Sequence, residues 1–108
     1  MTHQDAFERI AEVMGCKWSL LILDLIAKGV NRPGAIEREL PGLTAAVLHR
    51  CLNRMERDGL LVKSVQDGPV LKAEYRFSDQ GQSFVALVDQ ARVLAHDWRG
   101  SQRAGQLD

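Results

Sequence analysis

Side chains able to hydrogen-bond nucleic-acid bases recur at helical spacing between residues 44 and 58. The apolar positions, which we expect to face inward, are Val47, Leu48, Leu52 and Met55. The remaining positions are Ala45, Ala46, His49, Arg50, Asn53, Arg54 and Arg57. An arginine can pair with a guanine edge or a phosphate, and an asparagine with adenine. A face of scattered charges is also typical of a solvated helix, so the spacing alone leaves both interpretations open.

The two cysteines, Cys16 and Cys51, fall on different predicted helices without a pairing pattern. In a reducing compartment we expect both to be free thiols. The histidines are not at ligand spacing with either cysteine, so the sequence predicts no metal site and no cofactor. It contains no glycine-rich phosphate loop and suggests no Ser-His-Asp arrangement, and we expect Glu8, Glu12 and Asp24 to be solvated helix charges. These observations argue against an enzyme.

The composition is that of one ordinary globular domain. The chain has 108 residues, of which 45% are hydrophobic and 26% charged. These values exclude a disordered chain, a collagen-like chain and a small disulfide scaffold. The net charge is zero, but the segment 31–76 holds eight basic and six acidic residues. This small basic excess is weak support for a nucleic-acid partner.

The sequence shows no signal for a membrane protein. Its longest apolar run, 18–27, is interrupted by Asp24 and is too short to span a bilayer. The first residues lack the basic-then-apolar order of a secretory signal, so we expect a cytoplasmic location.

Hydrophobic periodicity and helix-breaking residues predict four successive helices in the first half of the chain. Their approximate ranges are 4–14, 18–26, 33–40 and 44–58. Pro33 suits the first position of the third helix, and Thr44 is a plausible N-cap of the fourth. Asp58 and Gly59 end the fourth helix.

Beyond Gly59 the apolar period changes to that of short strands. The predicted ranges are 60–65 and 73–77 for two strands, about 79–99 for a last helix and 101–108 for a flexible tail. The strands flank a polar turn over 66–72, and Ser78 with Asp79 would cap the last helix. Two short helices joined by a Pro-Gly turn and followed by a hairpin make a winged helix-turn-helix. The expected fold class is therefore mainly α with a small β-hairpin wing, in one domain over 1–100.

Four segments resemble, in order, the motifs of HxlR-type winged-helix transcription regulators, which are related to the MarR type. GCKWSLLIL at 15–23 resembles the Gly-Gly-Lys-Trp-x-Leu-x-Ile-Leu signature, and LPGLT at 40–44 resembles the entry to the recognition helix. LNRMERDGLL at 52–61 matches the exit from that helix, and EYRFSDQG at 74–81 matches the strand that leads to the last helix. The resemblance covers roughly residues 7–98.

The resemblance implies a homodimer that occupies a palindromic operator on double-stranded DNA and so blocks or permits transcription. The recognition helix would be 44–58 and the wing 62–77, with the helices at about 4–14 and 79–99 forming the dimer interface. The DNA-contacting candidates are Arg32, Thr44, Ala46, His49, Arg50, Asn53, Arg54, Lys63 and Lys72. Ala46 and Cys51 stand where the family tends to carry basic residues, which would weaken attraction to phosphates.

The resemblance also implies a regulatory site near the dimer interface. Candidates for an effector pocket or the interface are Phe7, Lys17, Trp18, Leu94 and Trp98. Trp18 either packs in the core or forms one wall of a pocket shared with Trp98 across the dimer. Many relatives sense oxidants or electrophiles through a cysteine before the first helix, where this chain has Asp5. Cys16, beside Lys17 at a helix N-terminus, is then either a redox thiol or a small residue in a tight junction.

Two hypotheses follow. The first is a DNA-binding regulator of the HxlR type, modulated by a small-molecule or electrophile effector or by redox chemistry. The alternative is a dimeric small-molecule-binding or protein-interaction module with weak or lost DNA binding, which the neutral charge, Ala46 and Cys51 favour.

Overall fold

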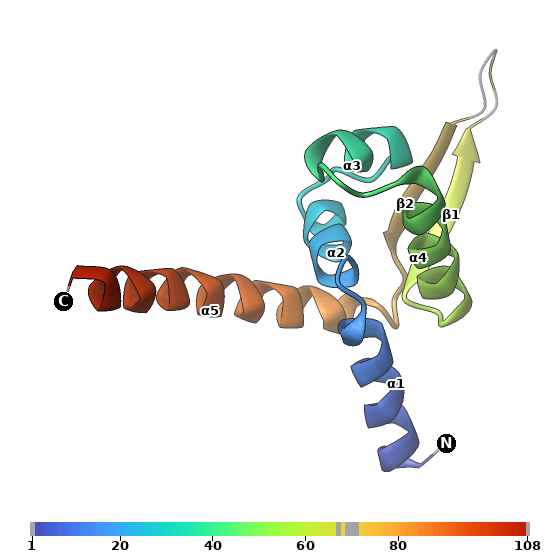
Figure 1. Ribbon diagram of the computed structural model, residues 1–108. Helices are drawn as coiled ribbons and strands as arrows, with labels where there is room; N and C mark the ends of the chain where they lie inside the picture. The colour runs from blue at the N-terminus through green and yellow to red at the C-terminus, as the bar shows by residue number, and fades with distance from the viewer. Residues whose placement is uncertain (1, 67, 69–71, 108) are drawn as a thin grey trace.

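The computed structural model describes residues 2–66, 68 and 72–107, with side chains described up to residue 100. Within these ranges, helices and strands follow in the predicted order. They are α1 His3–Gly15, α2 Ser19–Ala27, α3 Pro33–Glu39, α4 Ala45–Arg57, β1 Leu61–Gln66, β2 Lys72–Phe77 and α5 Gln82–Leu107. Figure 1 shows α2, α3, α4 and the hairpin forming the body of the molecule, from which α1 and α5 extend. The predicted fold class, mainly helical with a small hairpin, is confirmed.

Helix α2 is the element around which the core forms. Its side chains are almost all apolar, and Ile22 and Leu23 are completely buried. The helix contacts α1, α5 and β2, so both extending helices and the wing are joined through it. It begins at Ser19, and Trp18 occupies the N-cap position instead of the first helical turn.

A charged contact joins α2 to α5. Asp24 accepts hydrogen bonds from the guanidinium of Arg92 and lies 3.0 Å from the ammonium of Lys28. The expectation that Asp24 is a solvated helix charge was wrong, because its side chain is largely covered and paired. Burial raises the pKa of Asp24, but its hydrogen bonds to Arg92 and Lys28 outweigh burial and hold the pKa below the usual value. The carboxylate thus stays ionised at neutral pH and fixes α5 against α2.

Helix α4 begins and ends as the sequence predicts. The Thr44 hydroxyl accepts a hydrogen bond from the Val47 amide at 3.2 Å, which satisfies an amide that has no partner within the helix. At the other end, Gly59 has a φ of 82°, a conformation that favours glycine and turns the chain into β1. The stripe of Leu48, Cys51, Leu52 and Met55 is buried. Helix α4 contacts α3 and β1.

Strands β1 and β2 form one antiparallel hairpin. Leu61 pairs with Phe77 and Gln66 with Lys72. Tyr75 and Phe77 are buried, and they anchor the base of the hairpin in the core. Most of the polar turn predicted over 66–72 lies outside the described residues.

The last helix differs from its predicted range. Helix α5 begins at Gln82 and continues to Leu107, through residues for which the sequence predicts a tail. Ser78 does not cap this helix; its hydroxyl donates to the Gly59 carbonyl at 2.5 Å and accepts from the Gly81 amide at 2.8 Å. It therefore fastens the loop before α5 to the end of α4. Neither α5 nor another helix in the described ranges is long and apolar enough to cross a membrane.

We predict that Gly81→Ala destabilises the fold by about 1–3 kcal/mol. A Cβ atom at Gly81 would lie 2.1 Å from the carbonyl oxygen of Leu60, a backbone atom that cannot move without displacing β1. Urea unfolding followed by circular dichroism measures the loss. The matched control is Gly15→Ala, where no atom lies within 4 Å of the added carbon. Equal stability of both variants would contradict the packing at Gly81.

Candidate nucleic-acid interface

The polar face of α4 lies opposite its buried stripe. At 3.6 residues per turn, the exposed side chains of this helix occupy one continuous side. They are Ala45, Ala46, His49, Arg50, Asn53, Glu56 and Arg57. Thr44, at the N-cap, is also exposed, although its hydroxyl already accepts the Val47 amide. The face thus presents an imidazole, an amide and two guanidinium groups, which can bond base edges or phosphates, while Ala46 offers only a methyl group.

Arg54 lies at the edge of this face, turned toward α1. Its guanidinium is 3.1 Å from the carboxylate of Glu12 on α1 and 3.9 Å from that of Asp58. Glu12 is therefore paired, although its side chain remains largely exposed, as expected of a solvated helix charge. Arg50, one turn earlier, forms no ion pair with any residue that the structure describes. Of these two arginines, Arg50 retains the less compensated charge.

Arg32 is held by the wing. Its guanidinium donates two hydrogen bonds to Oε1 of Glu74, at 2.7 and 3.2 Å, and both side chains are half-exposed. Next to it, the Tyr75 amide donates to the Asn31 carbonyl at 2.9 Å. These contacts fix the base of the wing to the connection between α2 and α3. A phosphate would have to compete with Glu74 for this guanidinium.

The strand register separates the two wing lysines. Lys63 pairs with Tyr75 and Lys72 with Gln66. Because side chains alternate along a strand, Lys63 and Lys72 point to opposite faces of the hairpin, and one surface cannot contact both equally. Arg76, which the sequence analysis did not single out, shares the face of Lys72 and is exposed. The sequence could have indicated this, because charged residues alternate along the strand at Lys72, Glu74 and Arg76 and alternate residues share one face.

Large apolar side chains are exposed on both extending helices. On α1 they are Phe7 and Ile10, and on α5 they are Leu87, Val93, Leu94 and Trp98. Phe7, Leu94 and Trp98 have exposed fractions of 61–63%. Leu87, Leu94 and Trp98 recur at a helical spacing that places them on one side of α5.

Trp18 packs within one chain. Its ring atom Cη2 lies 3.7 Å from the position of a Cβ at Gly42, in the turn before α4. The Lys17 ammonium sits 4.9 Å from the centre of the Trp18 ring, a cation–π distance. The side chain therefore supports the helix-turn-helix, which favours packing over the pocket-wall interpretation.

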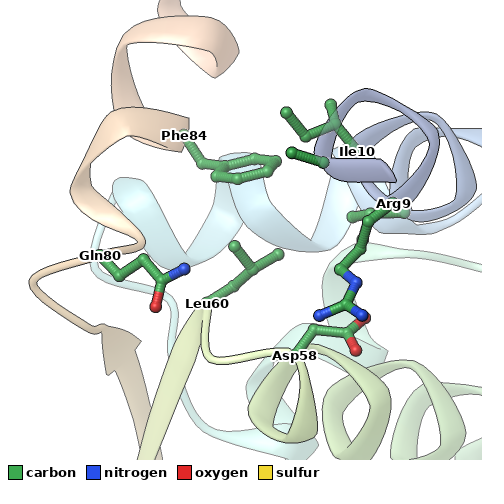
Figure 2. Close-up of a pocket in the computed structure, with 8 residues that line it drawn as sticks. Arg9, Ile10, Asp58, Leu60, Gln80 and Phe84 are labelled. Carbon is green, nitrogen blue, oxygen red and sulfur yellow. The ribbon is translucent and has the colours of Figure 1, made fainter. Parts of the chain in front are cut away.

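A cavity that the sequence analysis missed lies where α1, the end of α4 and the start of α5 meet. Its volume is about 190 Å³, and its lining residues are Ala6, Arg9, Ile10, Val13, Asp58, Leu60, Gln80 and Phe84. Figure 2 shows Phe84 and Leu60 forming its apolar floor, with Arg9 reaching from α1 toward Asp58. None of these residues forms a local motif, so only the fold brings them together.

The structure brings Cys16 and Cys51 together, although no pairing pattern was visible in the sequence. Their sulfur atoms are 3.6 Å apart, and both are free thiols. Burial raises the pKa of Cys16, but hydrogen bonds from the Ser19 side chain, the Trp18 and Ser19 backbones and Cys51 lower it by more. Burial, together with the nearby Cys16, raises the pKa of Cys51 to about 11. Cys16 is therefore the thiol that ionises first.

Helices α3 and α4, followed by the hairpin, form a winged helix-turn-helix, and the family and relatives that match this chain are transcription regulators and not enzymes. The model of the family described as HxlR-like helix-turn-helix matches residues 13–103. The chain belongs to this family.

Known relatives agree with this assignment. The uncharacterized HTH-type transcriptional regulator YdzF of Bacillus subtilis (strain 168) is 34% identical over 90 residues, which cover 82% of this chain and 83% of YdzF. The crystal structure of the HTH-type regulator YtcD has a TM-score of 0.79 at 27% identity and covers 93% of this chain and 99% of that one. The redox regulator HypR in its reduced form has a TM-score of 0.81 at 23% identity, over 92% of this chain and 98% of that one, and shows the fold alone.

We predict that iodoacetamide alkylates Cys16 at least about tenfold faster than Cys51 in the folded protein near pH 7.5. The raised pKa of Cys51 leaves almost no thiolate at this pH, whereas the lowered pKa of Cys16 favours one. Peptide mass spectrometry after timed quenching measures both rates. In urea the two rates should converge, which serves as the control. Equal rates in the folded state would contradict this assignment of the thiolate.

Proposed function

We propose that this protein is a cytoplasmic homodimer that binds a palindromic operator on double-stranded DNA and controls transcription by occupying it. Each protomer contributes one winged-helix domain, with α4 in the major groove and the wing against the flanking backbone. The observation that carries the proposal is the α4 face, on which His49, Arg50 and Asn53 are exposed opposite a fully packed stripe.

The residues proposed to contact DNA fall into two groups. His49, Arg50 and Asn53 point from α4 and would meet base edges or phosphates, and Ala46 and Thr44 would lie close to the DNA at the start of the helix. Lys72 and Lys63 would meet phosphates from opposite faces of the wing. Arg32 and Arg54 would first have to leave Glu74 and Glu12, so we assign them weaker contacts.

The exposed apolar side chains of α1 and α5 support the homodimer. Large exposed apolar side chains gathered along one helix side, as on α5, are typical of association surfaces in soluble proteins. A two-fold interface built from Phe7, Leu94 and Trp98 would cover them and place the two α4 helices on successive major grooves, about 34–36 Å apart. An effector in the cavity between α1, α4 and α5 would change this spacing only if it bound one spacing more tightly than another.

We predict that Arg50→Ala weakens binding to the operator about tenfold, the equivalent of ~1.4 kcal/mol for one lost base or phosphate contact. Fluorescence anisotropy on duplex DNA from upstream of the protein's own gene, titrated at several salt concentrations, measures the change. If the lost contact is to a phosphate, the slope of log affinity against log salt should become shallower by about 0.9.

Arg99→Ala is the matched control, since it removes the same charge from an exposed position on α5. An equal loss in both variants would mean that net charge, not α4, carries binding. Wild-type binding that is weak and indifferent to sequence and to Arg50 would contradict recognition of this DNA through α4. It would favour the alternative of a dimeric small-molecule-binding or protein-interaction module.

We predict that Leu94→Glu combined with Trp98→Glu shifts the protein from dimer to monomer at micromolar concentration. The substitutions place charges on the apolar side of α5, and burying unpaired carboxylates costs several kcal/mol. Sedimentation velocity measures the change. His96→Glu, on the opposite side of α5, is the control and should leave the dimer intact. A dimer that survives the double substitution would exclude this side of α5 as the interface.

A further inference from the structure

A pair of thiols lies behind the recognition helix, away from its exposed face. Cys16 stands in the connection between α1 and α2, and Cys51 in the middle of α4, with 3.6 Å between their sulfur atoms. A disulfide requires about 2.05 Å, so a relative movement of roughly 1.5 Å would join them. Because Cys16 has extended backbone outside both helices, its connection can follow such a movement.

We propose that Cys16 and Cys51 form a reaction site for small hydroperoxides, which oxidise the pair to a disulfide within one chain and thereby weaken operator binding. The effect on operator binding rests on the function proposed above, whereas the thiol chemistry is independent of it. The bond would tie the middle of α4 directly to the start of α2.

The two thiols have different roles because their surroundings differ. Cys16 is half-buried and receives hydrogen bonds from Ser19 and Trp18, which stabilise its thiolate and lower its pKa. Cys51 is buried in the core stripe of α4 and remains protonated. Cys16 is therefore the nucleophile that attacks the peroxide, and Cys51 is the thiol that resolves the product.

The chemistry balances with hydrogen peroxide as the oxidant. The Cys16 thiolate attacks one peroxide oxygen, the O–O bond breaks, and sulfenic acid and hydroxide form. Cys51 then gives its proton to this hydroxide, which becomes water. The Cys51 sulfur attacks the Cys16 sulfur, the S–O bond of the sulfenic acid breaks, and the second hydroxide so released takes a proton from solvent and also becomes water. Two electrons pass from the thiols to the peroxide. Loss of the Cys16 negative charge in the first step removes one cause of the raised pKa of Cys51, which assists the second step.

A cavity of about 70 Å³ lies beside both cysteines. Besides the two cysteines it is lined by Glu12, Val13, Ser19, Arg50, Arg54 and Met55. This space admits a molecule of the size of hydrogen peroxide but not a bulky organic hydroperoxide. The guanidinium groups of Arg50 and Arg54 act to lower the pKa of Cys51, against the stronger effects of burial and of Cys16, which raise it.

The disulfide would act on the recognition helix as a whole. Leu48, Leu52 and Met55 are buried on both sides of Cys51, so any part of the closing movement that falls on Cys51, and not on the connection bearing Cys16, moves α4 as a unit. The moved helix would disturb the contact of Arg54 with Glu12 on α1. Since α1 belongs to the proposed interface, the distance between the two recognition helices would change.

The first test is the mass of the protein after exposure to hydrogen peroxide. We expect the chain to lose two hydrogen atoms, to remain a single chain on a non-reducing gel, and to yield one linked peptide containing Cys16 and Cys51. Chains linked in pairs, or persistent sulfenic or sulfinic acid without a disulfide, would overturn the proposal.

Two variants separate the roles of the thiols. Cys51→Ala should stop at sulfenic acid on Cys16, trapped by dimedone, and Cys16→Ser should leave Cys51 unmodified at the same peroxide dose. Circular dichroism checks that both variants fold. Cumene hydroperoxide should form the wild-type disulfide at least about tenfold more slowly than hydrogen peroxide. Oxidation that starts at Cys51 would overturn the proposed order of the two thiols. Equal rates with both peroxides would overturn the proposed access through the small cavity.

The second test compares operator affinity of the reduced and disulfide forms. We expect about tenfold weaker binding after oxidation of the wild type and no change in peroxide-treated Cys16→Ser. Unchanged affinity of a verified disulfide form would overturn the coupling. Absence of operator binding in the reduced form would instead contradict the function proposed above, while the mass measurement still decides the thiol chemistry.

Discussion

Burial of the apolar surface of α2 is the constraint on which the other elements depend. Ile22 and Leu23 are inaccessible to solvent in a core to which α1, α5 and β2, all in contact with this nine-residue helix, contribute. At about 25 cal/mol for each Å² of apolar surface removed from water, such burial is the main favourable contribution to folding. The same packing fixes where the extending helices leave the body. A helix this short has little stability alone, so it and its neighbours form together.

The α4 helix meets a second constraint, because it packs in the core and also presents a polar surface. Its buried stripe occupies one side of the helix, and the N-cap Thr44 stabilises the first turn by accepting a hydrogen bond from the Val47 amide. Among the residues that the structure describes, carboxylates pair with Arg32 and Arg54 but not with Arg50. Two basic side chains of the segment 31–76 are therefore already compensated by carboxylates within the protomer.

Helix ends that depend on neighbouring residues were predictable from the sequence, whereas contacts between residues distant in sequence were not. Thr44 and the Asp58-Gly59 pair predicted both ends of α4, because helix capping and a left-handed glycine depend only on residues next to each other in sequence. The Arg32–Glu74 pair and the Cys16–Cys51 contact join residues far apart in sequence, and no periodicity encodes them. The end of α5 was misplaced for a related reason: Gly100 suggested a stop, but it lies within the helix.

The length of α5 has a thermodynamic consequence. Its 26 residues extend roughly 39 Å, yet residues 92–100 are all exposed. An isolated helical segment of this length is marginal in water, and Gly100 weakens it further. In the homodimer proposed above, association would supply the free energy that keeps this half of α5 ordered, so local helical order and subunit concentration would be linked by mass action. Dilution of that dimer would then melt part of a helix as well as separate the subunits.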